Sequence, residues 1–205
     1  MPSSAVLLLA AGASTRLGQP KQLLTYQGQT LLRRAAETAV AAAAGGPVVV
    51  VTGALHAALL PELAGLPVTV VHCPAWAQGM GASLKAGLAA LETAGPLPEL
   101  TVVLCDQPHV TAGLLGQLRA THAATGRPLV ACEYDGVRGV PVFFAAEALP
   151  LLRALPEAAG AGQLLRQHPA LVAAVPFPAG AVDVDTPAQY AALLAAEKGR
   201  SEGQE

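Results

Sequence analysis

The sequence predicts an α/β protein built on a mostly parallel β-sheet with helices on both faces. Short runs rich in valine and leucine, bounded by glycine or proline, alternate with Ala-rich or amphipathic segments of helical length. The apolar runs are continuous, which is typical of strands buried on both faces. With 53% hydrophobic and 13% charged residues among 205, the chain can form a large core. Alternating strands and helices indicate βαβ units and therefore parallel strands.

The first two thirds of the chain alternate regularly between the two kinds of element. The expected strands are residues 5–10, 47–52, 67–72 and 100–105, with a weaker candidate at 128–132. The expected helices are residues 30–44, 55–64, 81–93 and 111–125. Because parallel strands end at one edge of a sheet, the loops that follow these strands are expected to form the ligand site.

The last third departs from this alternation. Asp135-Gly136 predicts the turn of a hairpin spanning 133–144, a small excursion from the sheet. Thr-Pro-Ala-Gln at 186–189 predicts the start of the last helix, with the threonine as N-cap and the glutamine reaching back. The remaining expected elements are helices near 145–153 and 162–167, strands near 171–175 and 181–184, and a last helix ending near residue 197. We expect one domain over residues 1–198 and a flexible tail over 199–205.

The composition argues against several classes of protein. A net charge of −2 and 3% aromatic residues disfavour a nucleic-acid-binding surface. Three widely spaced cysteines without a C-x-x-C motif disfavour a disulfide framework or a zinc site and suit a reducing compartment. The N-terminal apolar run lacks a basic flank, and every apolar stretch is interrupted before it reaches membrane-spanning length. We therefore expect a cytoplasmic protein.

The loop after the first expected strand is suited to phosphate groups. It offers successive backbone N–H groups around residues 11–13, then Arg16 and Lys21, and no acidic residue precedes Glu37. Arginine can donate to two phosphate oxygens at once, and lysine supplies a mobile point charge. The loop is neither a dinucleotide fingerprint, because Ser14 replaces a required glycine, nor a P-loop, because no G-K-[ST] follows. The alternative is an ordinary surface turn with two solvated cations.

Three of the four aspartates follow expected strands. Asp106, Asp183 and Asp185 lie near the expected ligand edge, whereas Asp135 is explained by the hairpin turn. Carboxylates beside phosphates suit Mg²⁺, which typically takes one or two carboxylates plus substrate phosphates. Asp106 and Asp185 are the preferred ligands. The alternatives are an N-cap for Asp106, although Thr111 is the better cap, and a turn before the last helix for the other two.

Two further segments are expected at the same edge. Thr52 and Gly53 follow the second strand, and Gly79, Gly81 and Ser83 open a helix where a ribose or base could approach the backbone closely. The second signal is weak by itself, because a plain helix N-terminus explains it equally well.

Together these motifs resemble those of the MobA-like nucleotidyltransferases, and most closely the MocA-type molybdenum cofactor cytidylyltransferases. The resemblance implies a Rossmann-like, three-layer, doubly wound fold of the nucleotide-diphospho-sugar transferase type. The matching motifs occur in order and span nearly the whole chain: LAAGASTRLGQPK at 9–21, VTG at 51–53, QGMGASL at 78–84, DQP at 106–108 and DVDTP at 183–187.

The resemblance also implies roles for individual residues. Catalysis is expected from Arg16, Lys21 and Asp106, and Mg²⁺ is expected at Asp106, Asp185 and Asp183. Ala-Ala-Gly in the first motif goes with cytidylyl transfer, which implies CTP, with molybdopterin as acceptor and a molybdoenzyme as a possible partner. Nucleotide contacts are expected at Leu9, Ala10, Ala11, Gly12, Arg16, Lys21, Thr52, Gly53, Gly79, Gly81 and Ser83.

Two segments on the acceptor side differ from the family pattern. Val140 stands where the family commonly has histidine, and Ala158 and Gly162 stand where it commonly has aspartate and arginine. The nucleotide half of the pattern is intact. Transfer from another nucleotide, or to another small phosphate, is therefore an alternative, and so is a non-catalytic nucleotide- or flavin-binding protein.

Overall fold

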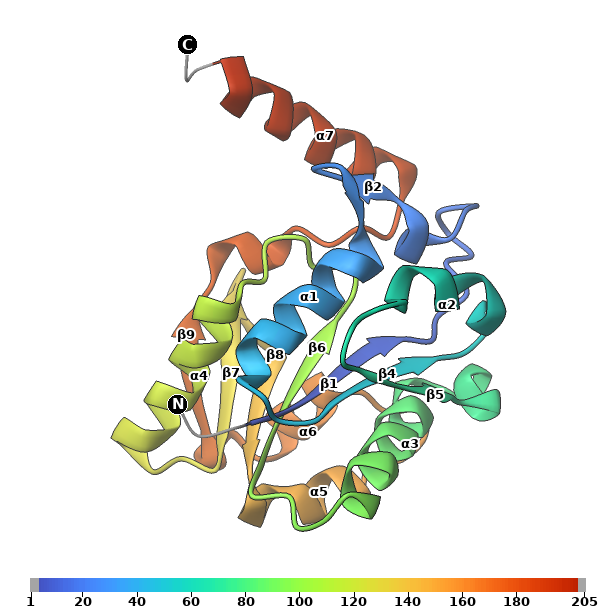
Figure 1. Ribbon diagram of the computed structural model, residues 1–205. Helices are drawn as coiled ribbons and strands as arrows, with labels where there is room; N and C mark the ends of the chain where they lie inside the picture. The colour runs from blue at the N-terminus through green and yellow to red at the C-terminus, as the bar shows by residue number, and fades with distance from the viewer. Residues whose placement is uncertain (1–3, 203–205) are drawn as a thin grey trace.

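The computed structural model describes residues 4–202, with side chains for residues 4–197, around a seven-stranded β-sheet (Figure 1). β1 lies near the middle, and the chain adds strands on one side of it and then on the other. Such a reversal of strand order next to a central strand is where open α/β sheets bind ligands. In spatial order the strands are β5 (Thr69–His72), β4 (Val48–Thr52), β1 (Ala5–Ala10), β6 (Glu99–Leu104), β8 (Val137–Ala145), β7 (Leu129–Tyr134) and β9 (Val172–Pro176).

All strands of this sheet run in one direction except β8, which is antiparallel to β6 and β7. β7 and β8 form the predicted hairpin, and its turn residues Asp135 and Gly136 have φ values of 47° and 72°. The predicted mostly parallel α/β sheet with a hairpin excursion is confirmed.

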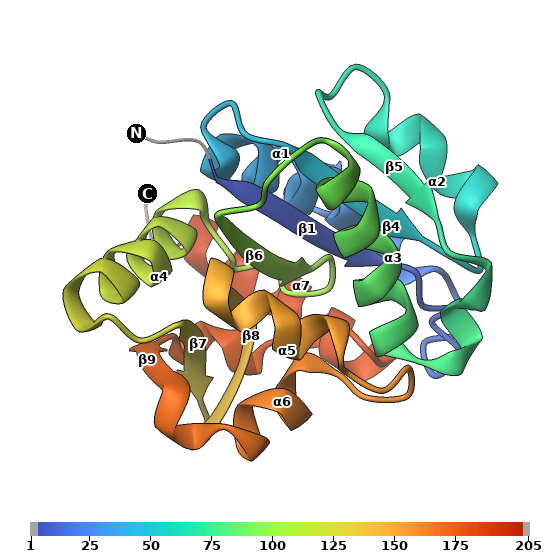
Figure 2. The ribbon, with the colours of Figure 1, turned by 90° about the horizontal axis from the view of Figure 1, so that it is seen from below.

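Helices cover both faces of the sheet (Figure 2). Val6 and Leu8 of β1 point into the core on one face, and Leu7 and Leu9 point into the core on the other. This explains why the strand is apolar at every position. The first core packs α1 (Leu31–Ala43), α2 (His56–Leu63) and α4 (Ala112–Thr125). The second packs α3 (Met80–Thr93), α5 (Leu149–Arg153) and α6 (Ala161–Gln167).

A third, smaller core was not predicted. It joins the opening loop through Leu17, a short hairpin of β2 (Thr25–Tyr26) and β3 (Gln29–Thr30), and the last helix, α7 (Pro187–Glu202). Val184 and Leu193 are buried in it. This core attaches the last segment of the chain to the loop after β1.

The predicted strand at 181–184 is wrong. A 3₁₀ turn covers Pro178–Ala181, and the segment then crosses the ends of the strands instead of lying beside one. Its contact with the sheet is a hydrogen bond from the Val184 amide to the Asp106 carbonyl, 3.2 Å long. Crossing the sheet edge in this way carries the two late aspartates to the end of β6.

The predicted helix caps are confirmed. Thr111 accepts a hydrogen bond from the Leu114 amide at 3.2 Å, so Asp106 is not the cap of α4. Thr186 accepts from the Gln189 amide at 3.3 Å. α7 runs to Glu202, beyond the expected end near residue 197, and residues 203–205 of the expected tail lie outside the described residues. No helix among the described residues is long and apolar enough to cross a membrane.

Gly87 tests how tightly α3 packs on the sheet. A Cβ at this position would lie 2.2 Å from Leu7 Cδ1 and 2.7 Å from Val51 Cγ2, and both neighbours are fully buried. We expect Gly87→Ala to lower the free energy of unfolding by about 1–3 kcal/mol, because overpacking a close-packed core costs that much. Urea denaturation followed by circular dichroism measures the change.

Gly116 is the matched control on α4. It is exposed, and a Cβ there would meet nothing within 4 Å. Gly116→Ala should raise the free energy of unfolding by about 0.5–1 kcal/mol through helix propensity. Equal effects of the two substitutions would contradict the packing argument.

Candidate functional site

A cleft of about 310 Å³ lies at the carboxyl ends of β1 and β6, at the reversal of strand order. One wall is the loop after β1. The opposite wall is the 3₁₀ turn Pro74–Gln78 and the first turn of α3, including Trp76, Gly79 and Ser83. Cys105 and Asp106 form its floor at the end of β6.

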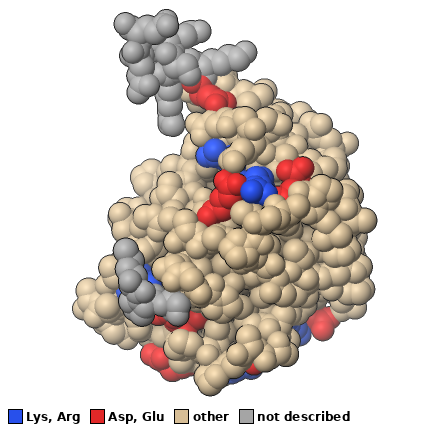
Figure 3. All heavy atoms as spheres, in the orientation of Figure 1, with Lys and Arg blue, Asp and Glu red and all other residues tan. Residues whose placement is uncertain are grey.

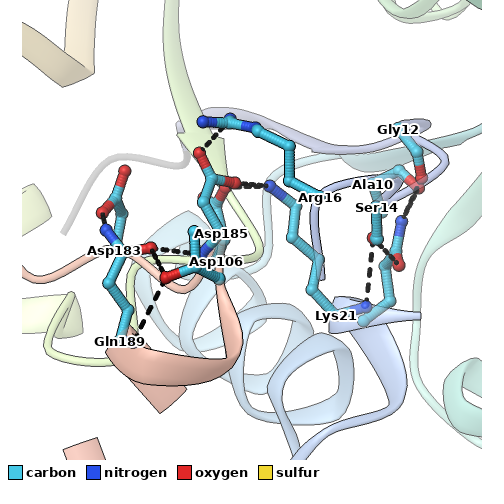
Figure 4. Close-up of polar contacts among 11 residues, drawn as sticks. Ala10, Gly12, Ser14, Arg16, Lys21, Asp106, Asp183, Asp185 and Gln189 are labelled. Carbon is cyan, nitrogen blue, oxygen red and sulfur yellow. Dashed lines mark hydrogen bonds and ion pairs between the residues drawn. The ribbon is translucent and has the colours of Figure 1, made fainter. Parts of the chain in front are cut away.

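Gln22 holds the loop after β1 in place, a role that the sequence does not predict. Its side chain is fully buried, and its Nε2 donates to the carbonyls of Ala10 at 3.1 Å and Gly12 at 2.7 Å. Ser14 Oγ donates to Gln22 Oε1 at 3.2 Å and accepts from the Lys21 amide at 3.1 Å. These bonds fold the loop back on itself (Figure 4). A buried glutamine beside a loop of small residues has no signature in a single sequence.

The same loop contains unbonded backbone donors, and Gly12, which carries one of them, lines the cleft. In the described residues, no backbone hydrogen bond is formed by the amides of Gly12 and Ala13. Free N–H groups next to a cation form an anion-binding concavity. This agrees with the phosphate loop expected from the sequence.

Lys21 and Arg16 converge with two of the three aspartates (Figure 4). Lys21 Nζ lies 2.5 Å from Asp106 Oδ2 and 2.8 Å from Asp185 Oδ1. Arg16 Nη2 lies 2.5 Å from Asp185 Oδ2. The Lys21 side chain is 17% exposed and that of Arg16 is 72% exposed. Lys21 is therefore an internal bridge, and Arg16 is an exposed cation at the mouth of the site.

The electrostatic environment keeps the bridge charged. Burial alone lowers the pKa of Lys21, but the charges and hydrogen bonds of Asp106 and Asp185 outweigh it and hold that pKa above its ordinary value. Burial likewise raises the pKa of Asp185, whereas the hydrogen bonds and charges of Lys21 and Arg16 prevail and keep it below its usual range. Both groups are therefore ionised at neutral pH.

Asp183 is held differently. Burial and the nearby charges of Asp185 and Asp106 raise its pKa, and no lysine or arginine pairs with it in the described residues. Gln189 Nε2 donates to Asp183 Oδ1 at 2.6 Å, and Gln189 Oε1 accepts from the Asp185 amide at 3.1 Å. Gln189 thus fixes both late aspartates from the first turn of α7 (Figure 4).

The carboxylates fit a divalent cation only in part. Asp106 Oδ1 is buried without a hydrogen-bond partner among the described residues, and carboxylate oxygens are the ligands that Mg²⁺ and Mn²⁺ prefer. No three His, Cys, Asp or Glu side chains in the described part of the chain form a metal-binding group. A cation held here therefore needs additional oxygens, which phosphates can supply.

Most of the expected nucleotide-binding residues surround the cleft. Thr52, Gly53 and Gly81 do not line it, and Arg16 lies outside it at the mouth of the site. The Thr52 hydroxyl lies 2.7 Å from His56 Nδ1, and a Cβ on Gly53 or Gly81 would lie 2.5 or 2.2 Å from a backbone oxygen. These glycines allow close packing behind the cleft. The expected residues that line it are Leu9, Ala10, Ala11, Gly12, Lys21, Gly79, Ser83 and Asp106.

Two further cavities adjoin the cleft. One, of about 200 Å³, extends from Asp106 to Asp183 and the β7–β8 hairpin. The other, of about 430 Å³, lies between Met80, the hairpin and residues 158–163. Ala158, Gly162 and Val140 all line the larger one, so the segments that differ from the family pattern meet in space. Charged side chains are sparse on the face shown in Figure 3, which has no broad basic area.

Residues 6–172 match the family model of the MobA-like NTP transferase domain. The chain belongs to this family. It is thereby a nucleotidyltransferase of the MobA-like type, and the fold and the site position agree with that assignment.

Three relatives illustrate the range of the family. The chain is 35% identical to the nicotine blue oxidoreductase of Paenarthrobacter nicotinovorans, over 95% of this chain and 98% of that protein. It is 28% identical to the purine catabolism protein PucB of Bacillus subtilis, over 90% and 92% of the two chains. It is 31% identical to the molybdenum cofactor cytidylyltransferase of Escherichia coli, but only over 47% and 53% of the two chains.

The chain is also similar to solved structures. It is 28% identical to Rv0371c of Mycobacterium tuberculosis, with a TM-score of 0.77 over 94% of this chain and 98% of that one. A manganese complex of Rv0371c is 27% identical, with a TM-score of 0.72 and the same coverage.

Gln22→Met tests the role assigned to Gln22. Methionine fills the same volume but leaves the Ala10 and Gly12 carbonyls without donors. We expect the free energy of unfolding to fall by about 1–3 kcal/mol, the cost of leaving buried polar groups unbonded. We also expect faster amide hydrogen exchange over residues 11–18. Gln117→Met, at an exposed position on α4, is the control. Unchanged exchange in the Gln22 variant would refute the positioning role.

Proposed function

We propose that this protein transfers CMP from CTP to a phosphate monoester and releases pyrophosphate, with Mg²⁺ as cofactor. The observation that carries the proposal is the convergence of Arg16, Lys21, Asp106 and Asp185 beside a cleft lined by Gly12, whose amide forms no backbone hydrogen bond among the described residues. CTP as donor rests on the Ala-Ala-Gly motif and on the likeness to a molybdenum cofactor cytidylyltransferase. A cytoplasmic location suits the three free, buried cysteines.

The residues of the opening loop have complementary tasks toward a triphosphate. The Gly12 and Ala13 amides and Lys21 bind the phosphates in the cleft, and Arg16 approaches them from its exposed position. As the bond from the α-phosphorus to the leaving oxygen breaks, negative charge accumulates on the pyrophosphate. Arg16 and Lys21 neutralise that charge, which is where preorganised cations contribute most to the rate.

Asp106 and Asp185 are suited to hold the divalent cation, and Asp183 is placed to orient the pair. A bound Mg²⁺ or Mn²⁺ neutralises phosphate charge and aligns the donor. That the related Rv0371c forms a complex with manganese supports a divalent cation as cofactor. Asp106 Oδ1, which has no hydrogen-bond partner among the described residues, is a carboxylate oxygen that can coordinate such a cation.

Lys21 has two sets of partners that it cannot contact together. In the ligand-free protein its ammonium neutralises Asp106 and Asp185. When a triphosphate enters, Lys21 turns to the phosphates and releases the carboxylates. Its charge therefore stays inside the site in both states, and nucleotide and cation are expected to bind cooperatively.

The acceptor requires no general base. A phosphate monoester has its second pKa at about 6 and is already anionic at neutral pH. The protein needs only to align its oxygen with the α-phosphorus for in-line attack. Molybdopterin is the acceptor that the family resemblance implies, and a molybdoenzyme partner follows only for that acceptor.

A second candidate function is an oxidation–reduction reaction. It is favoured by the 35% identity to nicotine blue oxidoreductase over nearly the full length of both chains. Cys105, the thiol in the cleft, has its pKa raised to about 12 by burial and the charge of Asp106, so it is protonated at neutral pH. Such a reaction would therefore need a redox cofactor such as a flavin or nicotinamide nucleotide.

Thermal-shift measurements separate these functions. The ligands are CTP, GTP, ATP, UTP, FMN, FAD, NADH and NADPH, each with and without Mg²⁺. We expect stabilisation by CTP that depends on Mg²⁺, of about 2.7 kcal/mol at about 100 times the dissociation constant. Stabilisation by a different triphosphate would identify that nucleotide, instead of CTP, as the donor. Stabilisation by a redox cofactor alone would replace the proposal with the second candidate.

Asp106→Asn tests the chemical role of the carboxylate. The change keeps the shape but removes the charge, so we expect pyrophosphate release to fall by at least about 1,000-fold while the fold survives. Glu92→Gln, which removes the surface carboxylate paired with Arg153, should keep full activity. Full turnover of the Asp106 variant with Mg²⁺ would contradict the assignment.

Lys21→Met tests, without an activity assay, whether the Lys21 ammonium and a divalent cation replace each other beside Asp106 and Asp185. Without the ammonium, Asp106 and Asp185 repel each other and are open to another cation. We expect the nucleotide-free variant to bind Mn²⁺ on the order of 10-fold more tightly than the wild type in paramagnetic-resonance titrations. Its melting temperature should also rise more on adding Mn²⁺. Lys85→Met, at an ion pair with Glu157, is the control. If the Lys21 variant bound Mn²⁺ no more tightly than the wild type does, Lys21 and the divalent cation would not compete for the carboxylates.

A further inference from the structure

Trp76, the single tryptophan of the chain, belongs to the wall of the nucleotide cleft that lies opposite the loop after β1. In the described part of the chain it is the one aromatic residue that lines this cleft. Met80 and Ser83 belong to the same wall, and none of its described residues is charged. The wall therefore suits the uncharged part of a nucleotide rather than its phosphates.

The backbone around Trp76 is fixed in the ligand-free protein. The Trp76 amide donates to the Cys73 carbonyl at 3.2 Å, and the Trp76 carbonyl accepts from the Gly79 amide at 3.1 Å. This turn is tied to the sheet, because the Cys73 amide donates to the Thr52 carbonyl at 2.9 Å. A residue held in this way needs little reordering when a ligand binds, which favours affinity.

Gly53 provides the surface on which Trp76 packs. A Cβ at position 53 would lie 2.7 Å from both Cβ and Cγ of Trp76 and 2.5 Å from the Ala11 carbonyl oxygen. The tryptophan therefore packs directly against the backbone that follows β4, next to the loop after β1. The sequence predicts a nucleotide contact at Gly53, whereas the structure gives this glycine an indirect place behind Trp76.

The position of Trp76 relates it to the donor rather than to the acceptor. Trp76 lines neither of the two cavities that adjoin the cleft, and both of those cavities border the β7–β8 hairpin. It shares the cleft with Gly12 and Lys21, to which the phosphates of the donor are assigned. Once those phosphates occupy the loop side, the opposite wall is left for the base and the ribose.

We propose that Trp76 stacks on the base of the donor nucleotide and thereby gives the site affinity for nucleotides over bare polyphosphates. The inference rests on the proposed nucleotidyl transfer for the nature of the ligand, and it adds a binding residue to that function. An indole presents a large flat π face, and stacking on such a face commonly strengthens binding of a base by about 10-fold or more. Every base has a π face, so this contact supplies affinity rather than a choice among bases.

Fluorescence tests the contact in the unmodified full chain, because Trp76 is its only tryptophan. The probes are CTP and inorganic tripolyphosphate, each with Mg²⁺, and the second offers phosphates without a base. We expect CTP to quench the tryptophan emission, after correction for nucleotide absorbance, and tripolyphosphate to leave it unchanged. Equal changes with the two probes, or no change with bound CTP, would overturn the stacking assignment.

Substitutions separate stacking from packing. Trp76→Leu should weaken binding of CTP with Mg²⁺ about 10-fold in calorimetric titrations, and Trp76→Phe should weaken it less because it keeps a smaller aromatic face. Neither should change binding of tripolyphosphate with Mg²⁺. Leu151→Ala is the control, because Leu151 of α5 packs on the same core but does not line the cleft. Unchanged CTP binding by Trp76→Leu, or an equal loss for both ligands, would refute the role of Trp76.

Failure of this inference and failure of the proposed function give different results. If bound CTP requires the ring of Trp76 but releases no pyrophosphate with the phosphate monoesters tested, the stacking assignment stands and CMP transfer falls. If CTP releases pyrophosphate and Trp76→Leu raises the KM for CTP no more than Leu151→Ala does, CMP transfer stands and the stacking assignment falls. If another triphosphate gives the quenching, the stacking assignment stands with that nucleotide as donor.

Discussion

The bridge from Lys21 to Asp106 and Asp185 is the interaction on which the site depends. It joins the loop after β1, the end of β6 and the segment before α7, which are far apart in sequence. Three carboxylates gathered at one sheet edge repel one another, and the bridging ammonium makes that arrangement tolerable. The third hydrophobic core supports the same contact, because Leu17 of the loop and Val184 of the segment before α7 are buried in it together.

A bridge of this kind also limits how the protein can respond to ligands. Removing one partner of a part-buried ion pair leaves an uncompensated charge, which costs more than the pair itself contributes. A ligand that draws Lys21 away must therefore bring a positive charge to the carboxylates. A nucleotide bound together with a divalent cation does this, whereas a bare triphosphate does not. The charge balance of the ligand-free protein thus already favours a metal–nucleotide complex.

The sequence predicted the sheet and most of the loops at its edge, because continuous apolar runs and glycine- or proline-bounded turns are local signals. Asp135-Gly136 and the caps at Thr111 and Thr186 were predicted for the same reason. The strand at 181–184 failed because Val184 is buried by packing in the third core rather than by strand pairing, whereas Ala181 and Val182 are exposed. Gln22 was missed because its importance depends on carbonyls that only the folded loop directs toward it.

The two halves of the site are built from different parts of the fold. The nucleotide half is made of backbone and of the central parallel strands, so substitutions there disturb the core. The acceptor half is lined by the β7–β8 hairpin and residues 158–163. Gly79 and Gly81 pack directly on the backbone of residues 156–159. This backbone-to-backbone contact fixes the acceptor segment whatever side chains it carries. Side chains at 158 and 162 can therefore change the chemistry of the cavity wall without moving it.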